Sequence, residues 1–292
     1  MNKEKILKAG KIAKQAKDYI KPLIKKDMLL LDIAEKIEAK IIELGGKVAF
    51  PTSLAIDDVA AHYTPSPDDT TKAQGLLKVD LGVHIDGFIA DTAFSVDLEN
   101  NEENKKLIEA SEDALKNAIK IAKENISLSQ IGKTISNTIE SHSFFPIINL
   151  SGHEMKEYDL HAGMTVPNID DKKNIPLKKG LYAIEPFATI GVGKVHDGKP
   201  SGIYILTDTK KPRSPLARQV LDFIQEEYET LPFCSRWIVK KFGKTSLFAL
   251  SQLEQNNNLH HFPQLVEDSK NKVAQAENTI LVDDEGVIVT TE

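Results

Sequence analysis

Apolar residues recur at alternating steps of three and four in four stretches of the chain, which is the spacing of one face of an amphipathic helix. These stretches span residues 6–23, 34–44, 107–121 and 131–139. Gly45 and Gly46 provide a C-terminal stop for the second helix, and Ser127 is a suitable N-cap for the fourth. The pattern therefore predicts two pairs of helices.

Between and after the helix pairs, apolar and polar residues alternate as in β-strands. Residues 78–95 alternate on both sides of Ile85-Asp86-Gly87 and predict a β-hairpin. Strand-like stretches follow at residues 181–190 and 203–207, and a second hairpin covers residues 278–291. Two helices followed by strands thus occur twice. This order predicts a pseudo-two-fold α+β domain in which helices cover one face of a curved antiparallel sheet.

The stretch from residue 206 to residue 262 differs from the rest, because helical spacing returns there with little strand character. Three short helices are expected at residues 216–224, 235–242 and 246–255. We therefore expect residues 1–205 and 263–292 to form the main domain, and residues 206–262 to form a helical insertion.

Composition narrows the class of protein. The 292 residues are 41% apolar and 27% charged, as in an ordinary globular protein, and the net charge of −6 argues against a general nucleic-acid binder. Cys234 is the single cysteine, which excludes an internal disulfide and suits a reducing compartment. The start of the chain has no apolar signal segment, and no apolar run approaches a membrane span. We expect a cytoplasmic protein.

Two aspartates stand in the middle of apolar strands. Asp80 lies between Val79 and Leu81, and Asp91 follows Ala90. Charges are rare in such positions unless they are paired or hold a metal. A turn centred between Ile85 and Asp86 places the two aspartates directly opposite each other, where they repel unless a cation lies between them. A bulge at Gly87 would shift this register, and solvated aspartates on an open face are the alternative.

Three further metal-binding side chains have similar surroundings. His153 follows an apolar stretch, Glu185 lies among apolar residues, and Glu277 opens the last hairpin. Each alone is equally typical of a core histidine or an edge-strand glutamate. Together with the aspartates they make one histidine and four carboxylates, which suits a pair of divalent ions. Two such ions can promote amide hydrolysis.

The order Asp, Asp, His, Glu, Glu resembles the ligand set of the methionine aminopeptidase and prolidase superfamily, peptidase family M24. Local phrases are similar as well: FPTSLAIDDVAAHYTP at Phe50–Pro65, SGHEMKEYDLHAGMTVP at Ser151–Pro167, IEPFATIG, and LPFCSRW at Leu231–Trp237. The helical stretch between Glu185 and Glu277 resembles the insertion that distinguishes type 2 from type 1 methionine aminopeptidases. The chain is similar to the short, archaeal-length form of type 2.

This resemblance implies the pita-bread fold, with a small winged-helix-like insertion beside the catalytic domain. It implies removal of the N-terminal methionine from nascent peptides with a small second residue, through a metal-bridging hydroxide. Two divalent ions (Co, Mn, Fe or Zn) would be held by Asp80, Asp91, His153, Glu185 and Glu277. Of these, Asp91 and Glu277 would bridge the ions.

The resemblance also implies roles beside the metal ligands. Glu185 would handle the proton of the attacking water, while His62 and His161 would contact the substrate and stabilise the tetrahedral intermediate. The methionine pocket would be lined by Phe50, Leu160 and Ile203. The place of Ile203 depends on residues 191–202, where the sequence departs most from the family. We expect His62 to be the most exposed functional side chain and open to alkylation by an epoxide.

Two alternatives remain at this point. A non-catalytic interaction protein on the same fold would typically have substituted metal ligands, whereas all five are present here. An X-Pro aminopeptidase or dipeptidase typically carries a separate domain before the catalytic half, and only 79 residues precede Asp80. The expected partners are the peptide N-termini of nascent proteins. A ribosome contact is left open, a monomer is expected, and neither a membrane nor a nucleic-acid substrate is expected.

Overall fold

Two helix pairs and the sheets that they cover form the body of the protein. The computed structural model describes residues 2–292. The first pair is α1 (Lys3–Ile20) and α2 (Leu30–Glu43), and the second is α3 (Glu102–Ile121) and α4 (Leu128–Ser141). All four predicted helices are confirmed. Ser127 is the N-cap residue of α4, as predicted, although its hydroxyl makes no capping hydrogen bond.

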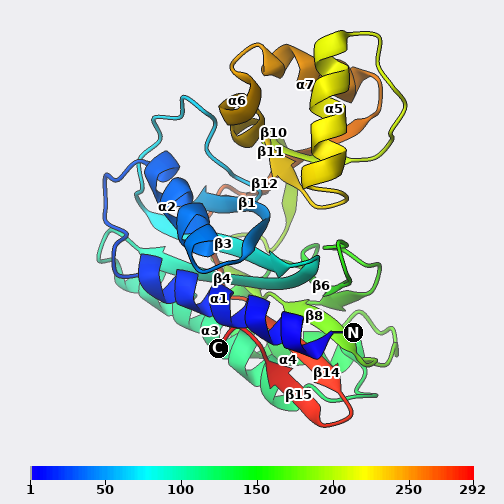
Figure 1. The fold of residues 1–292 in the computed structure, drawn as a ribbon. Coiled ribbons are helices and arrows are strands. Elements are labelled where there is room, and N and C mark those ends of the chain that lie inside the picture. The colour runs from blue at the N-terminus through cyan, green and yellow to red at the C-terminus, as the bar shows by residue number, and fades with distance from the viewer. Residues whose placement is uncertain (1) are drawn as a thin grey trace.

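The strands form a set of antiparallel sheets under these helices (Figure 1). One sheet has the order β1-β3-β4, with bounds Lys47–Ile56, Leu76–Ile85 and Phe88–Asp97. A second has the order β15-β14-β8-β6-β7, with bounds Gly286–Val289, Asn278–Asp283, Gly180–Ile184, Ser151–Met155 and Thr165–Pro167. A third has the order β13-β9-β5, with bounds Val273–Gln275, Phe187–Thr189 and Phe145–Pro146.

Each helix pair has its own apolar core against the strands beneath it. Helices α1 and α2 pack with β1, β3 and β4, while α3 and α4 pack with β8, β9, β13 and β14. The two halves meet where Ala93 of β4 bridges to Glu277, just before β14. The mixed, pseudo-two-fold architecture predicted from the sequence is therefore correct.

The first hairpin forms with a register that differs from the prediction. Its turn is Asp86-Gly87, and both residues have positive φ, 47° and 82°. Such a two-residue turn pairs Ile85 with Phe88, so Asp80 lies opposite Ala93 and Asp91 lies opposite Gly82. The directly opposed pair of aspartates was thus wrong. Asp80 and Asp91 are instead diagonal neighbours on one face, still within reach of each other.

Three short helices project from the body on a two-stranded stem (Figure 1). They are α5 (Pro215–Glu227), α6 (Ser235–Phe242) and α7 (Ser246–Gln255), as predicted. The stem pairs β10 (Val195–Leu206) with β12 (Leu259–Glu267), flanked by β11 (Phe233–Cys234) and β2 (Val59–Ala61). The helices share a separate apolar core. The domain boundaries at residues 206 and 262 stay a prediction.

None of the helices within residues 2–292 combines the length and the apolar character that crossing a membrane requires.

Candidate functional site

All ten side chains singled out in the sequence line one cavity between the two halves and the stem of the insertion. The five metal-ligand candidates are joined there by His62 and His161 and by the three pocket candidates Phe50, Leu160 and Ile203. They come from β1, β3, β4, β6, β10 and the loops between strands. Segments far apart in the sequence therefore meet at one place, where the sequence pattern had suggested a shared chemistry.

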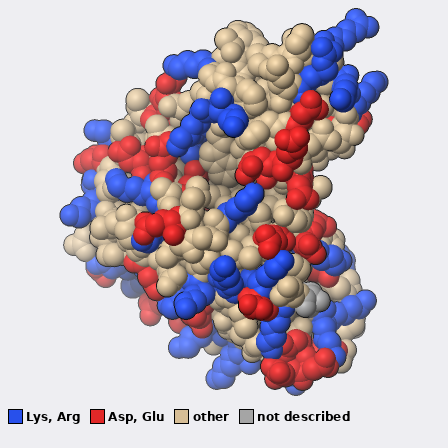
Figure 2. Space-filling view, viewed as in Figure 1, with Lys and Arg blue, Asp and Glu red and all other residues tan. Residues whose placement is uncertain are grey.

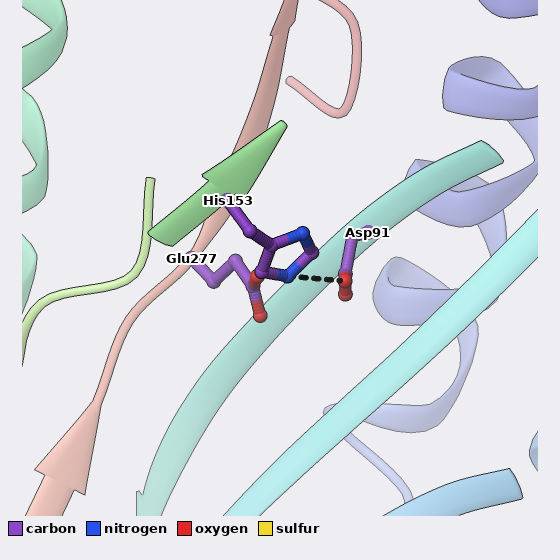
Figure 3. A group of neighbouring side chains, drawn as sticks. All are labelled: Asp91, His153 and Glu277. Carbon is purple, nitrogen blue, oxygen red and sulfur yellow. Dashed lines mark ion pairs between the residues drawn. The ribbon is translucent and has the colours of Figure 1, made fainter. Parts of the chain in front are cut away.

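His153 lies among carboxylates at the floor of this cavity (Figure 3). Its Nε2 is 3.7 Å from Asp91 Oδ2 and 3.7 Å from Glu185 Oε1. These separations are too long for hydrogen bonds but suit atoms that share one ion, each about 2.1 Å from it. Asp91, His153 and Glu277 offer ligand atoms that all lie within 4.8 Å of one another. All three side chains are buried.

The carboxylates of the site impose a large electrostatic cost on one another. Burial raises the pKa of Asp80 to about 7. Burial, and then the charges of neighbouring carboxylates, raise the pKa of Asp91, Glu185 and Glu277 well above their ordinary values. Buried anions gathered in this way are stabilised by a cation between them. Asp80 Oδ1 and Asp91 Oδ1 are buried without a hydrogen-bond partner in the described chain, so both oxygens are free to bind one. The residues fit a metal site.

Threonines and backbone hydrogen bonds align the strands that carry the acids. The Asp91 N–H donates to Thr279 Oγ1 at 2.7 Å, and this hydroxyl is also 2.8 Å from the Asp91 carbonyl. Thr92 Oγ1 donates to the Glu277 carbonyl at 2.8 Å, and backbone bonds join Ala93 to Glu277. Asp91 and Glu277 are therefore fixed relative to each other although they are far apart in the sequence. Sequence reasoning missed both threonines, which read there as ordinary strand residues.

The two site histidines are neutral and differently placed. His62 Nδ1 is 3.2 Å from the Pro263 carbonyl, which can only accept, so Nδ1 carries the proton and Nε2 keeps its lone pair. Burial lowers the pKa of His62 to about 4 and also lowers the pKa of His161. The rings of His161 and His153 are 4.4 Å apart. His161 is exposed whereas His62 is partly buried, so the expected greater exposure of His62 does not hold for solvent, and its reactivity stays a prediction.

The apolar wall of the cavity has members that the sequence did not reveal. Phe50 packs against Gly82, where an added β-carbon would lie 2.2 Å from the phenyl ring. Phe262 and Pro232 also line the cavity, and Phe262 meets the His62 ring edge-on at 5.7 Å. Both lie at the base of the insertion. No local signal identifies them, because their place depends on how the insertion folds back on the body.

Comparison with known proteins identifies the family of the chain. The pattern of metallopeptidase family M24 matches residues 4–284. The chain belongs to this family. It is 44% identical to a methionine aminopeptidase of Pyrococcus horikoshii, with 100% of both chains covered. The fold is that of a thermophilic Arx1 (TM-score 0.85, 14% identity, 98% of this chain and 90% of that one) and of Thermotoga maritima methionine aminopeptidase (TM-score 0.71, 20% identity, 100% and 98%).

The remaining histidines and the cysteine lie outside this cavity. Those histidines are His84, His142, His196, His260 and His261. Burial raises the pKa of Cys234 to about 12, so its thiol stays protonated and inert.

Proposed function

We propose that the chain removes the N-terminal methionine from peptides and nascent proteins whose second residue is small, as a metal-dependent aminopeptidase of type 2. The observation that carries this proposal is the convergence of five metal-ligand candidates, two histidines and an apolar wall in one cavity. The name of a relative that is 44% identical over the full length supports the substrate.

Two divalent ions would be held by Asp80, Asp91, His153, Glu185 and Glu277. Bound there, Co, Mn, Fe or Zn would supply Lewis-acid chemistry by polarising the scissile carbonyl and acidifying water. The proposal of two ions rests on the number of carboxylates. Four of them exceed the needs of one divalent cation, because their charges sum to twice its own.

One carboxylate and two histidines of the chain would carry out the proton transfers. Glu185 would take the proton of the attacking water, since its carboxylate faces the site, and burial and Asp80 raise its pKa well above the ordinary value. His62 would present Nε2 to the peptide, because Nδ1 is occupied by the Pro263 carbonyl. His161, nearer the opening, would contact the leaving amine. Both rings are neutral near pH 7 and can accept or relay a proton.

The apolar wall would select the side chain that is removed. This wall consists of uncharged, apolar side chains, namely Phe50, Leu160, Ile203 and Phe262. Such a lining suits the unbranched, polarisable methionine side chain. Discrimination against a side chain with one misplaced methylene would amount to about 1–3 kcal/mol. Equal rates on Met-Ala-Ser and Met-Leu-Ser peptides would contradict the preference for a small second residue.

The decisive experiment is hydrolysis of Met-Ala-Ser by the purified protein after chelation and after reconstitution with Mn, Fe, Co or Zn. We expect release of methionine only with metal, and we expect no release of the first residue from an X-Pro peptide. Cleavage of the X-Pro peptide alone would assign the chain to the dipeptidase branch. Full metal occupancy without any cleavage would favour a non-catalytic interaction protein.

We further propose that the chain works as a cytoplasmic monomer and that the far end of its insertion faces the ribosome. Basic side chains project from that end, while acidic ones gather beneath the insertion (Figure 2). Lys210, Lys211 and Arg213 border a surface cavity there, and none of them pairs with a carboxylate within residues 2–292. Co-sedimentation with ribosomes that persists in the K210E/K211E variant would contradict this orientation.

A further inference from the structure

A buried ion pair joins the insertion to the body beside the candidate site. Arg236 of α6 donates to both oxygens of Glu38 of α2, with NH1 to Oε2 at 2.8 Å and NH2 to Oε1 at 2.7 Å. The indole N–H of Trp237 donates to Glu38 Oε2 at 2.8 Å. Both charged side chains are at least nine-tenths buried, at 7% and 4% exposure. A bidentate pair removed from water in this way is geometrically specific.

The same pair contacts strand β1 where its pairing with β3 is irregular. Phe50 pairs with Gly82 and Ser53 with Asp80, so Pro51 and Thr52 together face the single residue Leu81. This bulge turns both Phe50 and Ser53 toward the cavity. Proline has no N–H, and the N–H of Thr52 lies 3.4 Å from Glu38 Oε1. Glu38 thus supports the bulge that presents Phe50.

The arginine end of the pair contacts a second wall of the cavity. Arg236 Nε donates to the Pro65 carbonyl at 3.2 Å, in the loop that begins at His62. Arg236 also follows directly on β11, whose Cys234 pairs with the cavity residue Ile203, and Pro232 of the cavity precedes that strand. Four wall segments, namely β1, the His62 loop, the Pro232 segment before β11, and β10, are therefore tied to one ion pair.

We propose that Glu38 and Arg236 are positioning residues for the methionine pocket. The pair sets the separation between the wall formed by β1 and the wall contributed by the insertion, without touching the substrate or a metal ligand. This inference rests on the proposed function, because it assigns a role in binding methionine. A positioning role explains why two charges are buried here in spite of the free energy needed to desolvate them. Two apolar residues could pack at the same place but would not fix the angle between α2 and α6.

The test uses two variants that avoid leaving a lone buried charge. Arg236→Lys keeps the charge but loses the bidentate contact and the bond to Pro65. The double variant E38Q/R236M removes both charges together. For each we expect KM for Met-Ala-Ser to rise by about tenfold or more while kcat stays within about threefold, with unchanged metal content. Binding of L-methionine, measured by isothermal titration calorimetry, should weaken by a similar factor.

Lys244 and Asp68 provide a matched control, because this pair also links the insertion to the body, at 2.8 Å, but in full exposure. Lys244→Gln should leave KM and kcat unchanged. An unaltered KM and methionine affinity in the folded test variants would overturn the proposal, as would loss of folding in both. If the wild-type protein binds L-methionine but does not cleave Met-Ala-Ser, the proposed function fails. The methionine affinities of the variants then still decide whether the Glu38–Arg236 pair positions the pocket.

Discussion

Asp91 and Glu277 occupy the most constrained positions of the site. Backbone hydrogen bonds across the Ala93–Glu277 bridge hold them side by side, and each is buried and surrounded by other carboxylates. An acid in such a place is stable only when its charge is shared with a cation or neutralised by a proton. These two residues should therefore be the most sensitive to loss of charge.

We expect Asp91→Asn and Glu277→Gln each to lower kcat/KM for Met-Ala-Ser by about 10³-fold or more, or about 4 kcal/mol. Each amide keeps the shape of the side chain but contributes no charge to the ions. The measurements are steady-state kinetics and metal per chain by elemental analysis, which should also fall. Asp283→Asn, at the exposed end of β14, is the control and should change neither quantity. Wild-type turnover with full metal content would remove the mutated residue from the site.

A second prediction concerns the nucleophilic nitrogen of His62. Because Nδ1 donates to the Pro263 carbonyl and burial lowers the pKa of the ring to about 4, Nε2 should be unprotonated at pH 7.5. An epoxide with an apolar tail that fits beside Phe262 should alkylate this nitrogen. Peptide mapping by mass spectrometry should find the adduct on His62 and none in the His62→Asn variant. His161 is the more exposed ring, so an adduct on His161 in place of His62 would show that solvent exposure, and not ring orientation, determines which histidine reacts.

At the scale of elements, helices were predictable and several strands were not. The helices have one buried and one exposed face, so their period is visible in the sequence. Strand β1 is buried along nearly its whole length, and most of β12 is partly buried on both of its faces, so neither strand alternates. The five metal-ligand candidates could be singled out in the sequence because charge is unexpected in apolar strands, and their role stays a prediction. Phe262, Pro232 and the Glu38–Arg236 pair depend on contacts between distant segments and leave no local pattern.

The turn of the first hairpin shows how one element controls another. Gly87 has φ of 82°, and a β-carbon there would lie 2.3 Å from the ring of Tyr158. The Tyr158 N–H also donates to the Gly87 carbonyl at 2.9 Å. Tyr158 leads into the loop that carries Leu160 and His161, so the hairpin turn supports one side of the candidate site.

We therefore expect Gly87→Ala to affect both stability and catalysis. Gly45→Ala is the matched control, because its φ of 83° imposes the same backbone strain but no atom lies within 4 Å of the added carbon. The control should lose about 1 kcal/mol of stability and keep its kinetics. Gly87→Ala should lose more and raise KM, because Tyr158 must shift. Thermal unfolding and kinetics on Met-Ala-Ser measure both, and identical behaviour of the two variants would contradict the supporting role.

At the scale of the whole molecule, the site exists only where the two halves meet. The first half contributes Asp80 and Asp91, and the second contributes His153, Glu185 and Glu277. A cation bound between them would therefore join the halves. In its absence the same carboxylates oppose their association, which couples folding to metal and to pH.

The sign of the pH effect follows from the pKa shifts. Acids with a raised pKa keep a proton in the folded chain that the unfolded chain releases, so stability falls as pH rises from about 4 through the folded pKa. This holds for Asp80, with a pKa of about 7, and for Asp91, whose pKa is higher than usual as well. Burial lowers the pKa of His62 to about 4 and that of His153 to about 3. These two histidines therefore make stability rise with pH, but only up to about pH 6.5, where histidines of the unfolded chain lose their protons.

Above pH 6.5 the carboxylates should thus control the metal-linked part of stability. We expect the rise in Tm on adding Mn²⁺ to the chelated protein to be larger at pH 8 than at pH 6.5, by roughly 5 °C. At pH 8 the ion replaces repulsion between ionised acids, whereas at pH 6.5 it must also displace protons. Burial lowers the pKa of Lys78 to about 7. Because Lys78 titrates both in the chelated and in the metal-bound protein, its effect cancels from the gain in Tm. Differential scanning calorimetry with and without metal measures the effect, and an equal gain at both pH values would show that the acids are not neutralised by the ion.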